Sequence, residues 1–466
     1  MTRFDPAEVG WRLGRSRVPR GVDLWVRSDR TTGVYGPPGS GKTLDVLAPA
    51  LLAAPGAALV TLTRADDLLL TVDHRASGGR PVAVLDPFGS VPGLPELVWD
   101  PVVGCGDAMV AERRAKAFAV GTMAAPAGGA GQGVALSSAA TRSEATETTK
   151  VLQGFFHAAA LTGQTIDQVL EWAAHPQAAG EPEDILRGHR YAAAHWALLL
   201  QGVLHGDPRT AANTSTAVRA ALSLFMQPTI RARCVPGPGR PATDIAQLIA
   251  AGGTVYLLGR DDPYASASPL LTALAEHVLD TAVQLAEASP HGRLCPSLLA
   301  CLDDLPSTAP LPTLRRRMAN DPTLGITFIY AAQTWRQLVI LYGEDEARAL
   351  FGLTNNIVVL GGGKDGRFYR EISELLGVTR VRATSYNAGR LGPARGEDVS
   401  ILRPAEIRRL PQGQALVVAE NASPLIAALT RRITGRSGQT LLAAKAAARQ
   451  RVSATRQHTV AEPGPR

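Results

Sequence analysis

The chain has 466 residues, of which 45% are hydrophobic and 19% charged, and this balance excludes an intrinsically disordered protein. Its net charge of +7 lies wholly in residues 431–466, which hold eight Lys or Arg residues and one acid. The remaining chain therefore has no basic surplus of the kind that marks a nucleic-acid-binding body. No run of about 20 continuous apolar residues predicts a membrane span, and no signal peptide is visible.

The four cysteines contain no C-x-x-C pair and no histidines at metal-ligand spacing. We expect Cys105, Cys234, Cys295 and Cys301 to be reduced, buried thiols of a cytoplasmic protein.

The first part of the chain predicts alternating strands and helices. Residues 1–30 are polar and basic, and we expect them to lead into the core through a short strand near Val22–Val26. Within residues 31–103, strands are expected at 32–35, 57–63 and 81–85, and helices at 44–54 and 65–75. This alternation is typical of a parallel sheet with crossover helices, the first part of a nucleotide-binding α/β domain.

The segment from Gly36 to Thr43 reads G-x-x-x-x-G-K-T and predicts a phosphate-binding loop between a strand and a helix. Its glycines let backbone N–H groups curl around phosphate oxygens, and the helix directs its N-terminal dipole at them. The lysine suits the β- and γ-phosphates of a nucleoside triphosphate, and the threonine hydroxyl suits Mg²⁺. Nucleotide contacts are therefore expected from Gly36, Gly39, Ser40, Gly41, Lys42 and Thr43.

Residues 104–251 change character and predict an all-helical domain inserted into the sheet domain. Apolar residues recur at helical spacing, with few strand signals. Helices are expected at 144–161, 165–174, 189–204 and 213–226.

Alternation returns in residues 252–430, which we expect to complete the nucleotide-binding domain. Strands are predicted at 254–258, 297–302, 325–331 and 357–360, and a long helix at 269–288.

Two of these strands end in polar residues suited to a nucleotide site. Asp303 and Asp304 follow an apolar strand, where P-loop ATPases hold Mg²⁺ and orient the attacking water. An Asp-Asp turn after a buried strand is the structural alternative. Gln333 follows the next strand and is a candidate γ-phosphate sensor, because ligands sit at the carboxyl ends of parallel strands. Alternatively, Gln333 caps the following helix.

The tail, residues 431–466, combines an Ala-rich helical piece with a polar end. Lys445, Arg449 and Arg456 fall on one face of that helix. Two interpretations stay open: an arm that binds DNA or a membrane surface, or a solvated, partly disordered end without a partner.

Taken in order, these motifs resemble those of the TraG/TraD-type coupling proteins of conjugative type IV secretion. The resemblance runs from about Gly33 to Leu376 and weakens toward Ala427. Besides the loop and the strand acids, it rests on Val82-Ala-Val-Leu-Asp-Pro-Phe-Gly89, Trp99-Asp-Pro-Val-Val103 and the block from Pro310-Leu-Pro to Gln333-Thr-Trp-Arg-Gln-Leu338. It implies a RecA-like P-loop domain with an inserted all-α domain, assembled as a homo-hexamer with ATP bound between subunits.

The chain departs from the family pattern in four respects. Asp304 stands where the usual second acid is Glu. Two expected arginines are missing, one replaced within Asn320–Gly325 and one by Asn355-Asn356. Arg348 is the leading candidate for the arginine that reaches a neighbouring subunit, with Arg315 and Arg317 as further substitutes. The family's N-terminal membrane helices are also absent, so a membrane tether is expected to be another subunit.

The resemblance implies an ATP-dependent motor that moves or hands over single-stranded DNA. Lys42, Asp303, Asp304, Gln333 and Arg348 would be its catalytic residues, and Thr43 and Asp303 would hold Mg²⁺. Its partners would be DNA, a relaxase or other transferred protein, and membrane secretion-channel subunits. Two other hypotheses remain: a nucleotide-gated recruitment module with little hydrolysis, and a double-stranded DNA translocase, which the large helical insertion disfavours.

Overall fold

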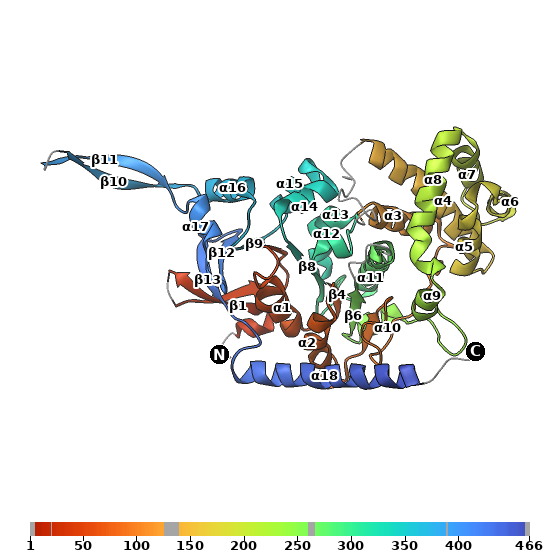
Figure 1. The fold of residues 1–466 in the computed structure, drawn as a ribbon, viewed down its shortest axis with the longest axis horizontal. Helices are drawn as coiled ribbons and strands as arrows, with labels where there is room; N and C mark the ends of the chain where they lie inside the picture. The colour runs from red at the N-terminus through yellow and green to blue at the C-terminus, as the bar shows by residue number, and fades with distance from the viewer. Residues whose placement is uncertain (1–4, 20, 125–138, 260–265, 388–389, 462–466) are drawn as a thin grey trace.

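Seven parallel strands form one side of an eleven-stranded sheet, up to and including one of its edge strands, in the computed structural model (Figure 1). The structure describes residues 5–19, 21–124, 139–259, 266–387 and 390–461. In order across the sheet, the strands are β2 (Asp23–Arg27), β1 (Gly10–Val18), β13 (Leu425–Leu429), β12 (Gln414–Ala419), β9 (Asn356–Leu360), β3 (Thr32–Tyr35), β8 (Ile326–Ala332), β7 (Leu298–Leu302), β4 (Ala58–Leu62), β6 (Thr254–Leu258) and β5 (Val82–Leu85).

Helices cover both faces of this sheet, which explains why its central strands are almost wholly apolar. Along β4, Leu59 packs into the core on one face and Val60 into the core on the other, because successive side chains of a strand alternate. Phe328 and Ile329 of β8 divide in the same way. The helices are α1 (Ala48–Ala53), α2 (Ala65–Arg75), α3 (Ala108–Ala124), α4 (Ala139–Leu161), α5 (Ile166–Ala174), α6 (Glu181–Gly188), α7 (Trp196–His205), α8 (Pro208–Leu222), α9 (Pro228–Cys234), α10 (Ile245–Ala250), α11 (Ser268–Ala288), α12 (Leu305–Thr308), α13 (Leu314–Asn320), α14 (Trp335–Tyr342), α15 (Glu344–Gly352), α16 (Gly366–Leu376), α17 (Pro404–Arg408) and α18 (Gly435–Ala461).

The predicted fold class is confirmed: the chain is an α/β protein with a mainly parallel sheet. The four strands β12, β13, β1 and β2 add an antiparallel edge to the sheet. Of these four, only β2 was predicted from the sequence, as the short strand near Val22–Val26. A two-stranded hairpin, β10 (Val378–Asn387) and β11 (Arg390–Ser400), was also missed and projects from the body in Figure 1. The helix expected at 189–204 is wrong at its start, because α6 ends at Gly188 and α7 begins only at Trp196.

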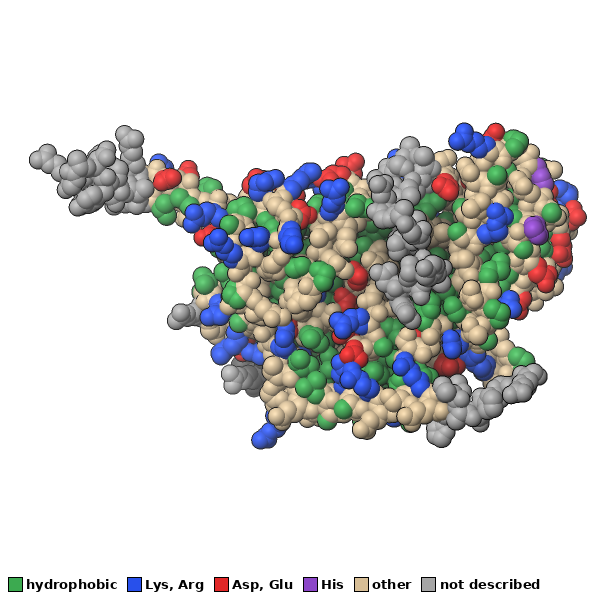
Figure 2. All heavy atoms as spheres, in the orientation of Figure 1, with side chains coloured by type: hydrophobic (Ala, Val, Ile, Leu, Met, Phe, Trp, Pro, Cys, Tyr) green, Lys and Arg blue, Asp and Glu red, His purple; other side chains and the backbone are tan. Residues whose placement is uncertain are grey.

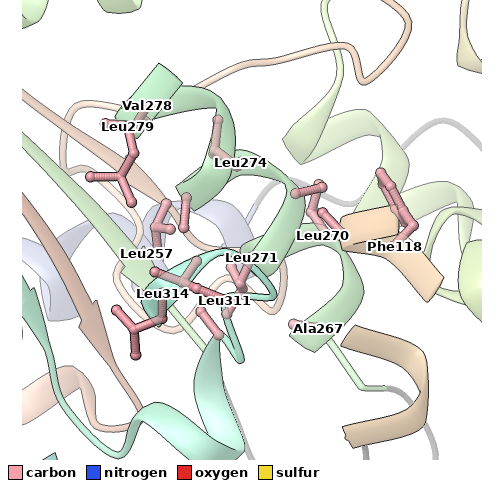
Figure 3. Close-up of a cluster of buried hydrophobic side chains, with 14 of the residues drawn as sticks. Phe118, Leu257, Ala267, Leu270, Leu271, Leu274, Val278, Leu279, Leu311 and Leu314 are labelled. Atoms are coloured by element: carbon pink, nitrogen blue, oxygen red, sulfur yellow. The ribbon is translucent and has the colours of Figure 1, made fainter. Parts of the chain in front are cut away.

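Helices α3–α10 all lie within residues 104–251, and most of them gather at one end of the sheet (Figure 1). Their core is continuous with that of the sheet (Figure 3). Phe118 of α3 packs in the same cluster as Leu270 and Leu271 of α11, which extends to Leu257 of β6. Because each buried Leu or Phe contributes about 1.5–3 kcal/mol, this cluster joins the helical part firmly to the sheet.

Trp99, the first residue of the Trp99-Asp-Pro-Val-Val103 motif, lies buried at the same junction. The His277 ring of α11 stacks on it at 5.5 Å between centroids, and the Arg114 guanidinium of α3 lies 4.4 Å from its ring centre. Burial, together with the smaller effect of the Arg114 charge, lowers the pKa of His277 to about 4, although Asp280 acts in the opposite direction.

This lowered pKa predicts that the fold loses stability in mild acid. An unfolded histidine titrates near pH 6.5, so the unfolded state binds the proton first as the pH falls from about 6.5 toward 4. We expect the single residue His277 to reduce the free energy of unfolding by about 2 kcal/mol between pH 7 and pH 5. Urea unfolding of the wild type and of His277→Phe at pH 7 and pH 5 measures this change in the free energy of unfolding. A pH dependence that is the same in both proteins would show that His277 is not its source.

The C-terminal segment is helical, as its Ala-rich sequence predicted. Residues Gly435–Ala461 form the single helix α18, which lies along the body next to α2 (Figure 1). Residues 462–466 lie outside the described part of the chain. Cys105, Cys234 and Cys301 are buried as expected, but Cys295 is exposed, because it lies in the turn that precedes β7. Among the described residues, no helix has the length and apolar content needed to cross a bilayer.

Candidate nucleotide site

The loop from Gly36 to Thr43 joins β3 to the helix that follows it, and its glycines are required by the backbone. Gly39 and Gly41 have φ values of +76° and +104°, which side chains rarely tolerate. A Cβ atom at Gly36 would lie 2.7 Å from the Ser40 hydroxyl and 2.8 Å from Leu360. The first turns after the loop, Lys42–Leu47, have π-helical hydrogen bonding and continue into α1. The chain thus forms a narrow cradle of backbone N–H groups at the carboxyl end of β3.

Thr43 and Asp303 meet across this cradle. The Thr43 hydroxyl donates a hydrogen bond of 2.6 Å to Oδ2 of Asp303, although 260 residues separate the two. They meet because β3 and β7 both flank β8 in parallel and end at the same edge. Oδ1 of Asp303 accepts the Asp304 N–H at 3.0 Å, so this buried carboxylate is fixed in place.

Lys42 lies within the loop and donates to the carbonyl oxygens of Gly36, at 2.6 Å, and Pro37, at 3.1 Å. Burial lowers the pKa of the Lys42 ammonium, and the charges of Asp303 and Asp304 oppose this shift. Burial also disfavours the charged form of Asp303 and so raises its pKa, while the Thr43 hydroxyl and the Lys42 charge favour the ionised form. One ammonium and two carboxylates thus face each other in a partly desolvated site.

Asp304 and Gln333 also come together at this edge. The Gln333 side-chain amide donates to both carboxylate oxygens of Asp304 at 3.3 Å. Asp304 has a left-handed backbone, with φ of +46°, at the start of α12. The capping alternative for Gln333 is wrong, because Thr334 caps α14 in a capping box with Gln337.

The candidate arginines do not lie at this edge. Arg348 of α15 is 52% exposed and pairs with Glu344 and Glu371. Arg315 is also exposed and pairs with Glu346. Arg317 is 2% exposed and is surrounded by carboxylates of its own chain, so as a residue that reaches another subunit it was a wrong candidate.

Asn355, which stands where an arginine was expected, has a structural role. Its side chain accepts the Thr31 N–H at 3.0 Å and donates to Glu420 at 2.6 Å. These bonds join β3, β9 and β12 at the amino end of β3, away from the phosphate loop.

Two contacts to the loop region come from the C-terminal part of the chain and were not predicted from the sequence. Arg431 pairs with the buried Asp45 directly after the loop, and the Gln412 side chain donates to the Gly39 carbonyl at 3.3 Å. Asp45 lies among apolar residues in the sequence, and this pattern could have indicated a buried acid that needs a partner. Nothing local identifies its partner.

The chemistry of this donor set fits a phosphate chain and a divalent cation. Within the described residues, the Ser40 hydroxyl is buried without a hydrogen-bond partner inside the glycine cradle. A hydroxyl and a carboxylate oxygen 2.6 Å apart, at Thr43 and Asp303, are the hard oxygen ligands that Mg²⁺ prefers. The geometry defines a RecA-like P-loop nucleotide-binding fold.

Comparison with known proteins confirms the resemblance to TraG/TraD-type coupling proteins. Residues 297–412 match a family model described as the TraM recognition site of TraD and TraG, and this region contains Asp303, Asp304 and Gln333. No curated protein matches the chain at a significant level.

Several solved structures share the fold. The bacterial conjugative coupling protein TrwBdeltaN70, in a trigonal form with sulphate, is 19% identical with a TM-score of 0.63, over 90% of this chain and 92% of that one. TrwB in complex with ADP and Mg²⁺ is 19% identical with a TM-score of 0.62, over 87% and 86%. VirB4 of Thermoanaerobacter pseudethanolicus is 12% identical with a TM-score of 0.51, over 92% and 98%. At these identities the likeness establishes the fold.

Proposed function

We propose that this chain is an ATP-dependent coupling protein of conjugative DNA transfer, which binds ATP with Mg²⁺ and hydrolyses it to move or hand over single-stranded DNA. The observation that carries the proposal is the meeting of Lys42, Thr43 and Asp303 around a glycine cradle. The fold-related TrwB has been solved with ADP and Mg²⁺ and with a non-hydrolysable ATP analogue, which supports the choice of ligands.

Each residue at the site has a role that follows from its chemistry. Lys42 and the loop N–H groups hold phosphate oxygens, and Ser40 has a free hydroxyl to add. Thr43 and Asp303 would hold Mg²⁺, which supplies positive charge against the phosphates when bound. Asp304 orients and deprotonates the attacking water, and Gln333, which already contacts Asp304, senses the γ-phosphate.

We also propose that the functional unit is a homo-hexamer, with ATP between subunits. Arg348 and Arg315 lie exposed on neighbouring helices, where a contact to another subunit is sterically open, and Arg348 remains the preferred arginine. Single-stranded DNA, a relaxase or other transferred protein, and channel subunits at the membrane are the partners that this role requires.

A recruitment module with little hydrolysis is the second candidate, and one observation favours it. The Asp304 carboxylate is one methylene shorter than glutamate, and both of its oxygens are engaged by Gln333 at 3.3 Å. A carboxylate held in this way is less available to a water molecule.

Steady-state ATP hydrolysis by the purified chain, with and without single-stranded DNA, tests the proposal. Strong stimulation by DNA is the expected result. Nucleotide binding without turnover in either condition would favour the recruitment module. Absence of nucleotide binding would overturn both.

Replacing Asp304 with asparagine is expected to lower kcat about 10²–10⁴-fold, because it removes a general base. Asn cannot take a proton, but it tolerates the left-handed backbone at this position. The site should therefore keep its shape, and nucleotide affinity should change little. Asp29→Asn, at an exposed ion pair with Arg27, is the matched control. If Asp304→Asn turns over ATP as fast as wild type, the role assigned to Asp304 is wrong.

A further inference from the structure

A buried carboxylate lies directly beneath the phosphate loop. Asp45 is 0% exposed, and its N–H donates to the Gly41 carbonyl at 2.8 Å. A Cβ atom at Gly41 would collide with Oδ2 of Asp45, so the carboxylate rests against the left-handed glycine that precedes Lys42. The conformation of this glycine sets where Lys42 and Thr43 begin the helix. Asp45 is therefore in a position to fix the loop.

Arg431 neutralises this carboxylate through a bidentate pair. Its Nε lies 2.7 Å from Oδ1 of Asp45, and a terminal nitrogen lies 3.0 Å from Oδ2. Parallel contacts of this kind fix the orientation of both groups as well as their separation. The pair joins residues that are 386 positions apart in the sequence.

The chain end is anchored beside the loop by apolar contacts. Ile433 and Leu441 pack with Leu44 and Ala48 of the helix that follows the loop and with Leu70 of α2. Further along α18, Ala448 and Val452 are buried against the sheet core. Arg431 is thus held between the end of β13 and a docked helix.

Ion pairs also place α18 on the body. Lys445 and Arg449 pair with Asp66, and Arg451 pairs with Asp73, both acids of α2. Figure 2 shows Lys and Arg side chains beside acidic ones where this helix meets the body. With Arg431, four of the seven basic residues in the described part of the tail form ion pairs within the molecule. These basic residues therefore help to hold α18 against the body, which argues against a free arm that binds DNA or a membrane surface.

We propose that Arg431 is a positioning residue for the phosphate loop: it holds the Asp45 carboxylate against Gly41 and so orients Lys42 and Thr43 toward the nucleotide. The inference rests on the proposed nucleotide binding. Without Arg431, the buried carboxylate would be left uncompensated, and the first helical turn would have to shift to hydrate it. The docking of the C-terminal segment thereby becomes part of the nucleotide site.

Titration of a fluorescent ATP analogue with Mg²⁺ into the full chain tests this inference. Arg431→Gln is expected to weaken affinity about tenfold or more, as loss of a supporting partner commonly does. Arg431→Lys should restore part of the affinity, because it keeps the charge but not the two parallel bonds. Arg449→Gln is the matched control and should bind within about twofold of wild type, since its pair with Asp66 is exposed.

Thermal melting separates positioning from simple loss of fold. If Arg431→Gln does not fold, the double variant Asp45→Asn/Arg431→Gln decides, because it buries no unpaired charge. A folded single or double variant that binds the analogue as tightly as wild type would overturn the inference. Failure of the wild type itself to bind would instead contradict the proposed function.

Discussion

Lys42→Ala is expected to lower the rate of ATP hydrolysis by at least about a hundredfold, the loss that typically follows removal of one preorganised donor to developing charge. The Lys42 ammonium lies inside the loop, on the carbonyls of Gly36 and Pro37, in the field of Asp303 and Asp304. In the proposed function, a charge held there would lie against the β- and γ-phosphates of bound ATP. Affinity should fall less than kcat, because the loop N–H groups remain.

The rate is measured as phosphate release at saturating ATP with Mg²⁺, and affinity by titration of a labelled analogue. Lys150→Ala is the matched control, since Lys150 pairs only with the nearby Glu147 on α4 among the ion pairs of the described residues. We expect the control to retain the wild-type rate. Hydrolysis by Lys42→Ala at the control rate would show that the loop is not the source of the measured hydrolysis.

The sequence predicted the site because each of its parts is a local pattern with a topological consequence. The loop motif identifies Lys42 and Thr43 without any knowledge of the fold. Asp303, Asp304 and Gln333 were found because each follows an apolar strand, and parallel strands bring their carboxyl ends to one edge. The structure places these five residues together.

The features that were missed depend on partners distant in sequence. The strand β12, Gln-Ala-Leu-Val-Val-Ala, is a short apolar run that periodicity alone does not distinguish from a buried helix. Its antiparallel pairing with β9 and β13 decides the outcome. The basic tail was interpreted by composition, which shows its charge but not the acids Asp45, Asp66 and Asp73 that face it.

Arg317 illustrates the same limit on a single residue. In the sequence it is one of three consecutive arginines, and nothing distinguishes it from Arg315. In the structure α13 turns Arg315 outward, whereas the Arg317 guanidinium points into α11. It contacts Glu276 at 2.7 Å, Asp280 at 2.6 Å and Asp321 at 3.4 Å.

The charges of this cluster hold one another in place. Burial lowers the pKa of Arg317, but the carboxylates of Glu276 and Asp280 outweigh this effect, so its pKa lies above the usual value. The Thr313 hydroxyl also lies 2.7 Å from both oxygens of Glu276, which satisfies that buried carboxylate further. Without the arginine, the acids would have to be hydrated or protonated.

Arg317→Met is therefore expected to destabilise the fold by about 3–5 kcal/mol, the usual effect of removing one partner from a buried ionic group. Arg315→Ala should change stability by less than about 1 kcal/mol, because its pair with Glu346 is exposed. Urea unfolding followed by circular dichroism measures both. If Arg317→Met were as stable as wild type but lost ATP hydrolysis, Arg317 would act on nucleotide after all, and the candidates for the intersubunit arginine would have to be reordered.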